Sequence, residues 1–130
     1  MTKINFKKIT TDAIVPIHGS AGAAGWDLYA NFQDSDSNQA KCIESGTSYM
    51  VGTGIAVEIP KGYVGLIFAR SGLASKQGLR PANCVGVIDS DYRGELKVAL
   101  HNDLNKNGWI GSGERIAQLV IVPYLEFELN

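Results

Sequence analysis

The 130-residue sequence has little that would tie it to a membrane or to an oxidising compartment. Its apolar stretches are far shorter than the ~20 residues that a membrane-spanning helix needs, and no apolar core of a signal peptide follows the lysines of the N-terminus. The only cysteines, Cys42 and Cys84, form neither a CxxC pair nor a zinc spacing. These absences predict a soluble cytoplasmic protein with two reduced thiols and no membrane association.

Charge is scarce and balanced. Charged residues make up 19% of the chain and the formal net charge is -1, whereas proteins that bind the phosphate backbone of nucleic acids are normally basic. Direct nucleic-acid binding is therefore disfavoured, while a local positive pocket is compatible with this composition. The sequence shows no internal repeat and no linker, and its length suits one domain, which we expect to span residues 1–130.

The usual groups of acyl-transfer chemistry are also missing. His18 falls in a presumed loop, and His101, at the end of a predicted strand, has no evident partner. The sequence GSG at 111–113 does not match a nucleophile elbow. Acids, arginines and a predicted helix N-terminus remain, and this inventory suits magnesium-assisted phosphate chemistry better than acyl transfer.

Glycine, by contrast, is abundant, with fifteen residues spread along the chain between short apolar runs. Strand lengths and alternating periods predict an all-β sandwich or barrel. The predicted strands are 55–59, 64–68, 95–100, 116–122 and 125–129, and the predicted hairpin turns are 60–62 and 107–108. One short helix is predicted at 71–78, with Ser71 as N-cap and Gly78 just past its end. The polar segment 31–39 is expected to be an exposed loop.

The densest group of polar residues is GVIDSDYRGE at 86–95. In an extended segment Asp89 and Asp91 point to the same side, and two acids on one face can hold a metal or share the work of a general base. Gly94 indicates a turn or a close approach of the backbone. A charged hairpin tip is the alternative, and for a D-x-D pair alone it is the more frequent explanation.

Three further positions carry polar groups next to apolar strands. Residues 69–72, Ala-Arg-Ser-Gly, put an arginine and a flexible glycine at a helix start, where free N–H groups attract anions. The alternative is a capped helix with a surface arginine. Asp27, between large apolar neighbours, either caps a turn or belongs to a site. Gln118, which interrupts an apolar strand, is either a site residue or an outward-facing residue of a one-sided sheet.

Four segments together resemble the first four motifs of the trimeric dUTPase family, in the family's order and at fitting separations. They are AGWDL at 24–28, RSGLA at 70–74, GVIDSDYRGE at 86–95 and GERIAQL at 113–119. The resemblance implies a β jelly roll with one short helix and a homotrimer with active sites at subunit interfaces. It also implies Mg²⁺-assisted hydrolysis of dUTP to dUMP and pyrophosphate, which supplies dUMP and keeps uracil out of DNA.

The resemblance further implies a role for each matched residue. Asp89 is similar to the general base that activates the attacking water, and Asp27 to the acid that holds the waters around Mg²⁺. The implied substrate-binding residues are Arg70, Ser71, Gly72 and Gln118 for the phosphates, Tyr92 for the sugar, and Asn83, Gly86 and the backbone near Lys97 in the hairpin that reads uracil. Arg115 matches its motif as a phosphate or structural residue, and Asp91 and Arg93 are expected to hold the hairpin and the subunit interface.

The sequence departs from the family pattern in three places. Ala69 stands where the family usually has proline, and Trp26 stands where tyrosine is common. The family's fifth motif, a glycine-rich arm with an arginine and an aromatic residue, does not occur in these 130 residues. Without such an arm, phosphate clamping and water exclusion would suffer while the uracil pocket would not. Two other functions stay open: a dUTP-binding regulatory protein with weak turnover, which lack of the arm would favour, and a related dCTP deaminase, a branch that shares the fold and an RS-containing phosphate motif.

Overall fold

The computed structural model describes residues 2–32 and 40–130, and in these residues nearly all regular structure is strand. The strands are β1 (Asn5–Lys8), β2 (Ile17–His18), β3 (Trp26–Tyr29), β4 (Lys41–Ile43), β5 (Ser48–Gly52), β6 (Ile55–Glu58), β7 (Tyr63–Phe68), β8 (Leu79–Pro81), β9 (Gly86–Ile88), β10 (Lys97–Asn102), β11 (Gly108–Ile110) and β12 (Arg115–Pro123). The helix α1 (Ser71–Gln77) lies between β7 and β8. Within the described residues, no helix is long and apolar enough to cross a membrane.

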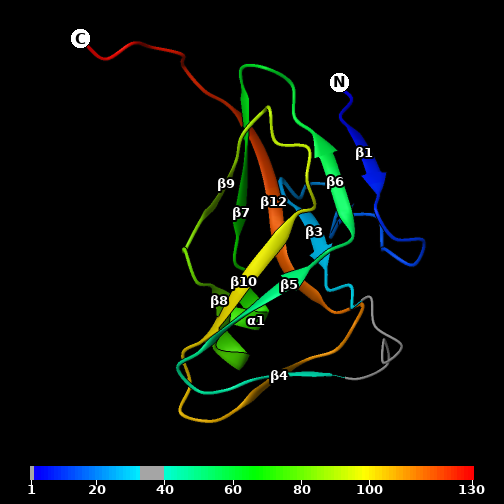
Figure 1. Ribbon diagram of the computed structural model, residues 1–130, viewed down its shortest axis with the longest axis vertical. Coiled ribbons are helices and arrows are strands. Elements are labelled where there is room, and N and C mark those ends of the chain that lie inside the picture. The colour runs from blue at the N-terminus through cyan, green and yellow to red at the C-terminus, as the bar shows by residue number, and fades with distance from the viewer. Residues whose placement is uncertain (1, 33–39) are drawn as a thin grey trace.

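The strands form an antiparallel jelly roll, as the resemblance implies. The largest sheet has the order β2-β3-β12-β7-β9, and a second sheet has the order β5-β10-β8 (Figure 1). The pairs β1-β6 and β4-β11 complete the fold. β12 is the longest strand and lies at the centre of the largest sheet, paired with β3 on one side and β7 on the other. β12 therefore connects segments that lie far apart in the sequence.

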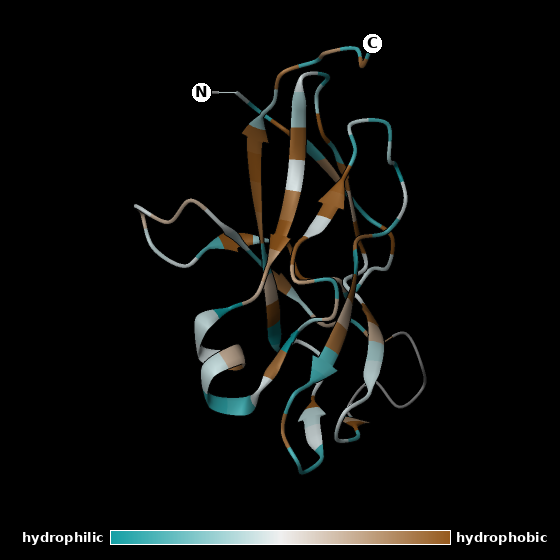
Figure 2. Ribbon diagram, turned by 90° about the vertical axis from the view of Figure 1, so that its left-hand side faces the viewer, coloured by the Kyte–Doolittle hydropathy of each residue, from teal (hydrophilic) through white to brown (hydrophobic). Residues whose placement is uncertain are grey.

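The core lies between the two larger sheets and is built from alternate residues of their strands. Figure 2 shows apolar residues concentrated on the central strands. Ile67 and Leu119 from the largest sheet and Val98 and Leu100 from β10 are all buried. Burying one such side chain contributes roughly 1.5–3 kcal/mol, so this alternation is the main source of the fold's stability.

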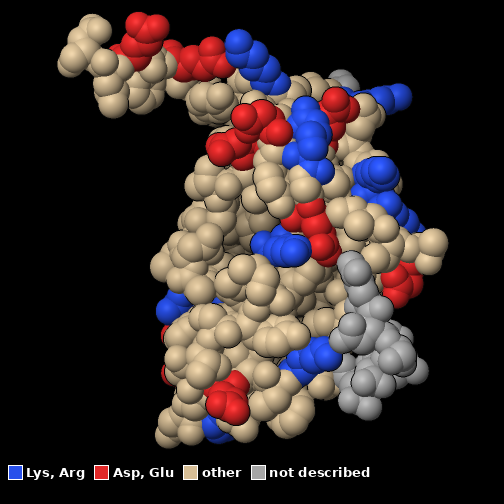
Figure 3. Space-filling model, viewed as in Figure 1, with Lys and Arg blue, Asp and Glu red and all other residues tan. Residues whose placement is uncertain are grey.

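The other side of the largest sheet is also apolar but partly exposed. Its residues are paired across the strands, Val120 and Val122 of β12 with Leu66 and Val64 of β7, and Leu66 in turn with Val87 of β9. Val87 is 61% exposed, and the surface over β9 carries few charges in Figure 3. We call these five residues the outer apolar face. A surface of this kind is typical of sites that contact another protein.

Four of the predicted strands are observed, displaced by one or two residues, as β6, β7, β10 and β12. The segment 60–62 is a turn, in which the N–H of Tyr63 donates to the carbonyl of Pro60 at 3.1 Å. It is not a hairpin, because β6 pairs with β1 while β7 pairs with β12 and β9. The predicted hairpin at 107–108 is wrong for the same reason, because β11 pairs with β4 and not with the preceding strand β10. Local turn chemistry does not identify the partner strand.

Two other predictions are wrong. Residues 125–129 alternate like a strand but form none, and Leu125, Phe127 and Leu129 are exposed. Asn31, expected in an exposed loop, is buried and its amide donates to Asp12 and accepts from Thr10. The hydrogen bond from Asn31 is the main cause that lowers the pKa of the Asp12 carboxyl, because it favours the charged form. Residues 33–39 of the predicted loop lie outside the described part of the chain.

The helix is present, but its cap differs from the predicted one. Arg70 is the N-cap, with no side-chain cap hydrogen bond, and Ser71 is the first helical residue. Gly78 ends the helix in the left-handed conformation, with φ 63°, and its N–H donates to the carbonyl of Leu73. A Cβ at Gly78 would also lie 2.5 Å from Cγ of Leu104. Glycine is therefore required here both by its backbone angles and by packing.

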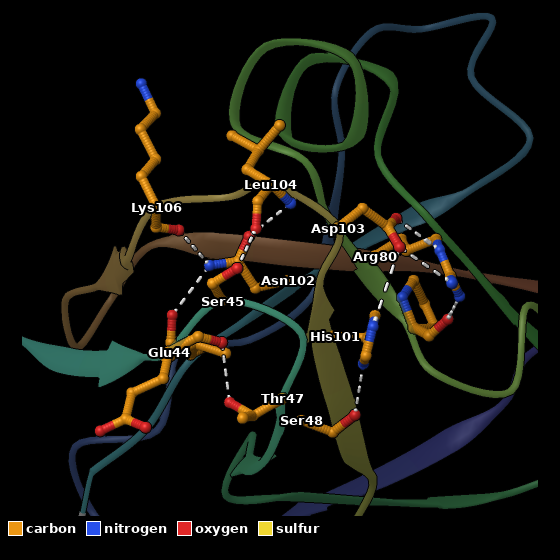
Figure 4. Close-up of polar contacts among 12 residues, drawn as sticks. Glu44, Ser45, Thr47, Ser48, Arg80, His101, Asn102, Asp103, Leu104 and Lys106 are labelled. Atoms are coloured by element: carbon orange, nitrogen blue, oxygen red, sulfur yellow. Dashed lines mark hydrogen bonds and ion pairs between the residues drawn. The ribbon is translucent and has the colours of Figure 1, made fainter.

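A buried asparagine connects three segments near α1 (Figure 4). The amide nitrogen of Asn102 donates to the carbonyls of Ile43 and Lys106 at 2.9 and 2.8 Å, and its oxygen accepts from the N–H of Leu104 at 2.9 Å. Asn102 is fully buried, so water cannot replace these partners. The side chain holds the end of β10 against β4 and the following turn.

We expect Asn102→Ala to lower the free energy of unfolding by about 2–4 kcal/mol, because it leaves buried carbonyl and N–H groups without partners. Urea denaturation followed by circular dichroism measures the loss. Asn105→Ala is the matched control, since Asn105 is exposed on the same turn. Equal stability of the two variants would contradict this account of Asn102.

Candidate functional site

A buried carboxylate bound by two arginines marks one end of the largest sheet. Asp27 of β3 is 8% exposed. Its Oδ1 lies 3.2 Å from Nε of Arg70, the N-cap of α1, and its Oδ2 lies 3.3 Å from Nη1 of Arg115 on β12. We call these three residues and Gln118 the Asp27 cluster. The guanidinium groups are partly exposed and each has five N–H donors, so most of their donors remain for an anionic ligand.

A β-bulge brings the members of this cluster onto one face. Side chains of a regular strand alternate, so Arg115 and Gln118, three residues apart, would point to opposite faces. β12 carries an extra residue, Ile116, where it pairs with β3. The bulge shifts the alternation by one residue, which lets both side chains lie on the side of Asp27. Arg115 therefore belongs to the Asp27 cluster through its ion pair with Asp27.

Gln118 is held between the backbones of two neighbouring strands. Its amide nitrogen donates to the carbonyl of Ala69 at 3.0 Å. A Cβ at Gly25 would lie 2.4 Å from its Oε1 and 3.2 Å from its Cβ. Gly25 is therefore the residue that leaves room for this amide. Gln118 lies on the side of β12 opposite the core, as the outward-facing alternative predicts, and its amide is held in a fixed position there. Ser71 and Gly72 follow Arg70 in the sequence and are exposed in the first turn of α1.

The second predicted group lies on residues 83–97, which we call the hairpin segment after the predicted hairpin, although β9 pairs with β7 and β10 pairs with β5 and β8, so that the two strands do not form a hairpin with each other. β9 leads into a turn in which the N–H of Tyr92 donates to the carbonyl of Asp89 at 3.1 Å. Asp89 and Asp91 thus lie in a turn and not in an extended segment, and the expectation of alternating side chains does not apply to them. Nη1 of Arg93 donates to the carbonyls of Ser90 and Tyr92, so Arg93 holds the turn as expected.

Asp89 and Tyr92 of the hairpin segment have different neighbours. Asp89 is exposed and borders a groove of about 580 Å³ that is lined in part by Val64, Leu66 and Val87 of the outer apolar face. The ring of Tyr92 lies over Gly94, where a Cβ would be 2.6 Å from the Tyr92 hydroxyl oxygen. Gly94 therefore provides the close backbone approach that the sequence predicts.

Two of the remaining predicted residues lie at the start of the same segment, and one at its end. Nδ2 of Asn83 is 3.6 Å from the place where a Cβ of Gly86 would lie, and Gly86 is paired with Ile67. Lys97 begins β10 and its Nζ lies 3.9 Å from Oε2 of Glu95. The segment thus carries all five of its predicted residues, Asn83, Gly86, Asp89, Tyr92 and Lys97.

Within one chain the two groups do not meet. Asp27 pairs with Gln118, and Gln118 pairs with Phe68, so the Asp27 cluster lies level with Phe68 of β7. Asp89 follows Ile88, which pairs with Gly65, so Asp89 lies level with Val64. These levels are four residues apart along β7, or about 13 Å. Within the described residues of one chain, the two groups of predicted site residues therefore stay apart.

Both histidines have partners that sequence patterns did not reveal. His18 lies in β2, its Nδ1 is 3.0 Å from the carbonyl oxygen of Gly25, and its ring stacks on Trp26 with centroids 3.8 Å apart. Nδ1 of His101 is 2.9 Å from Oγ of Ser48 (Figure 4). The expectation that His101 has no partner is thus wrong, because its partner lies on a strand far away in the sequence.

Known proteins that are similar to this chain in sequence or in fold belong to one family. The family model for dUTPase matches residues 11–130. The deoxyuridine 5'-triphosphate nucleotidohydrolase of Hydrogenobaculum sp. (strain Y04AAS1) is 44% identical over 127 residues, which cover 98% of this chain and 84% of that protein.

Two solved structures from staphylococcal phages resemble the whole fold. A mutant dUTPase of Staphylococcus bacteriophage 80alpha with dUpNHpp has a TM-score of 0.86 at 29% identity, covering 100% of this chain and 88% of that one. A mutant dUTPase from phage phi11 of S. aureus, whose structure concerns the coordination of a structural Mg(II) ion, has a TM-score of 0.85 at 26% identity, covering 99% and 95%. The four motifs, the antiparallel fold and these matches lead to one conclusion: the chain belongs to the dUTPase family.

Proposed function

We propose that this protein hydrolyses dUTP to dUMP and pyrophosphate by attack of water on the α-phosphorus, and that it does so in the cytoplasm, supplying dUMP and keeping uracil out of DNA. The observation that carries the proposal is the Asp27 cluster, which offers two partly exposed guanidinium groups beside a helix start in a chain of this family. A solved relative with dUpNHpp, at 29% identity, supports the choice of substrate.

The Asp27 cluster is the phosphate-binding half of the site. Arg70 and Arg115 neutralise the phosphate charge, and Asp27 fixes their orientation because each of its oxygens is bound to one of them. The amide of Gln118 has a second N–H donor besides the one that Ala69 accepts, and this donor is available to a phosphate oxygen. The exposed Ser71 and Gly72 add the hydroxyl and a backbone that a phosphate can approach closely.

The hairpin segment is the half that recognises the nucleoside and performs the chemistry. Asp89 is exposed beside the groove and acts as the general base, since the attacking water must lose a proton as it bonds to phosphorus. Tyr92 packs against the sugar and excludes a 2′-hydroxyl. Asn83, Gly86 and the backbone at Lys97 form the hydrogen bonds to uracil.

The donor set fits Mg²⁺ carried mainly by the nucleotide. Among the described residues, no three His, Cys, Asp or Glu side chains gather into a metal site. Mg²⁺ in phosphate enzymes is commonly held by one or two carboxylates, several waters and the substrate phosphates, so the single carboxylate of Asp27, acting through Mg²⁺-bound water, is sufficient. Bound there, the ion would neutralise charge on the phosphate oxygens.

We also propose that the protein is a homotrimer with active sites at the subunit interfaces. Two observations support this. The Asp27 cluster and Asp89 are separated by about 13 Å along the strand direction alone, and β12 and β7 also lie between β3 and β9, so the two groups are too far apart to act on one phosphate. The outer apolar face leaves Val87 and its neighbours partly exposed next to Asp89, where a second copy can cover them and bring its own Asp27 cluster.

The reaction is tested by release of pyrophosphate from dUTP, dCTP, dTTP and UTP, with Mg²⁺ and with EDTA. We expect release from dUTP alone and only with Mg²⁺. Asp89→Asn should still bind dUTP but lower kcat by about three orders of magnitude or more, because the water loses its base. Release from dCTP instead of dUTP, or an unchanged kcat in Asp89→Asn, would contradict the substrate or the base. Retained dUTP binding without release would favour a regulatory protein.

Gly25→Ala tests the phosphate role of Gln118. The added methyl group displaces the Gln118 amide, and loss of a hydrogen bond to a charged phosphate weakens binding of dUpNHpp by about tenfold or more. Gly22→Ala is the matched control, since a Cβ there meets nothing within 4 Å. Isothermal titration calorimetry measures both affinities, and equal values would remove Gln118 from the phosphate site.

The shared site is tested by mixing two inactive variants, Asp89→Asn and Arg70→Ala, during refolding. If Asp89 and Arg70 of one site come from different chains, random mixed trimers regain about a quarter of the wild-type activity, because half of the chains carry each intact group. Refolding each variant alone is the control. No recovery in the mixture would mean that one chain supplies both groups.

A further inference from the structure

Glu95 is a partly buried acid to which the proposed reaction assigns no role. It stands between the flexible Gly94 and the fully buried Leu96, at the point where the hairpin segment returns to the sheet. Its side chain is 15% exposed, although charged side chains normally avoid such burial unless their oxygens have partners. The carboxylate therefore has a structural or positioning task.

The carboxylate binds the turn between β5 and β6. Its Oε1 accepts a hydrogen bond from the N–H of Gly54 at 2.9 Å. The same atom lies 2.5 Å from the place where a Cβ of Gly52 would be, so only glycine at that position admits it. A second group, Nζ of Lys97, lies 3.9 Å from Oε2. The hairpin segment is thus fastened by this side chain to a turn more than forty residues earlier in the sequence.

The backbone of Glu95 in turn holds Tyr92. The hydroxyl of Tyr92 donates to the carbonyl of Glu95 at 2.7 Å. That carbonyl has a fixed direction, because the same planar peptide unit places the N–H of Leu96 on the carbonyl of Ile55 at 2.8 Å. Gly94, over which the Tyr92 ring lies, has the greatest backbone freedom of any residue type. Glu95 is the first residue after Gly94 whose side chain limits that freedom.

We propose that Glu95 is a positioning residue for sugar selectivity: by binding Gly54 it fixes the return of the hairpin and so the place of the Tyr92 ring. The inference rests on the proposed function, since it takes Tyr92 as the group that excludes a 2′-hydroxyl. The Glu95 carboxylate itself touches no substrate. Its loss therefore affects the choice between dUTP and UTP more than the rate with dUTP.

The test is the ratio of kcat/KM for dUTP to kcat/KM for UTP in the full chain. Glu95→Asp keeps the charge but is one methylene too short to reach Gly54, and we expect the ratio to fall by about tenfold, since displacements near 1 Å can change rates by up to two orders of magnitude. Glu95→Gln keeps an oxygen acceptor of the same reach and should stay close to the wild-type ratio. Glu44→Ala is the control, because Glu44 is exposed and only its backbone carbonyl takes part in a hydrogen bond.

Gly52→Ala is a second test that leaves the Glu95 side chain unchanged. The added methyl group would clash with Oε1 of Glu95 and displace the carboxylate. It should lower the ratio as Glu95→Asp does. If Glu95→Asp and Gly52→Ala slow dUTP and UTP by the same factor while Tyr92→Ala changes the ratio, Glu95 is merely structural and the inference is overturned. If Tyr92→Ala leaves the ratio unchanged, the proposed sugar role of Tyr92 fails, and the role of Glu95 fails with it.

Discussion

The pairing of β12 with β3 and β7 is the interaction on which the rest of the structure depends. Through this pairing Asp27, Gln118 and Phe68, which come from distant parts of the sequence, form one row across the sheet. The bulge at Ile116 adds Arg115 to the same side of β12. One strand thus supplies core residues on one face and the Arg115 and Gln118 side chains of the Asp27 cluster on the other, so the register that stabilises the fold also positions this cluster.

The same register separates the chemistry into two halves. β7 connects them, with the Asp27 cluster level with one of its ends and Asp89 level with the other. A rigid sheet cannot fold back to join its own ends, which is why the proposed active site draws on a second copy of the chain. In the proposed trimer, burying the outer apolar face and completing the site would be one event, because this face lies between the two groups. The proposed trimer would therefore couple assembly to activity through the same surface.

Much of the fold followed from local patterns. Alternation predicted β6 and β10, and short apolar runs predicted β7 and β12. The glycine after the helix was predicted from its backbone requirement. The segment 125–129 failed because alternation shows that a strand is favoured but not that a partner strand exists. The hairpins failed for a related reason, since turn residues determine where the chain reverses and not which strands then pair.

The candidate site was predicted mostly by family resemblance, and the residues alone offered each group with an alternative. Neither the family resemblance nor the residue pattern predicted contacts between residues far apart in the sequence. Arg115 bound to Asp27, the Gln118 amide against Gly25 and the Glu95 carboxylate on Gly54 all join segments more than forty residues apart. A bulge in particular leaves no mark in the residue pattern, yet it decides on which face Arg115 lies. Such features depend on register, which only the folded chain defines.

Gly78 limits how this chain can change over evolutionary time. Asparagine, the usual substitute at a left-handed position, satisfies the backbone but still brings a Cβ against Leu104. A smaller residue at 104 would make room but would leave a cavity beside α1 as long as glycine stays. A single substitution at position 78 or at position 104 is thus unfavourable, whereas both substitutions together need not be. The two positions are expected to vary together, and this link between the end of α1 and the 103–107 turn would be visible in an alignment as covariation rather than as invariance.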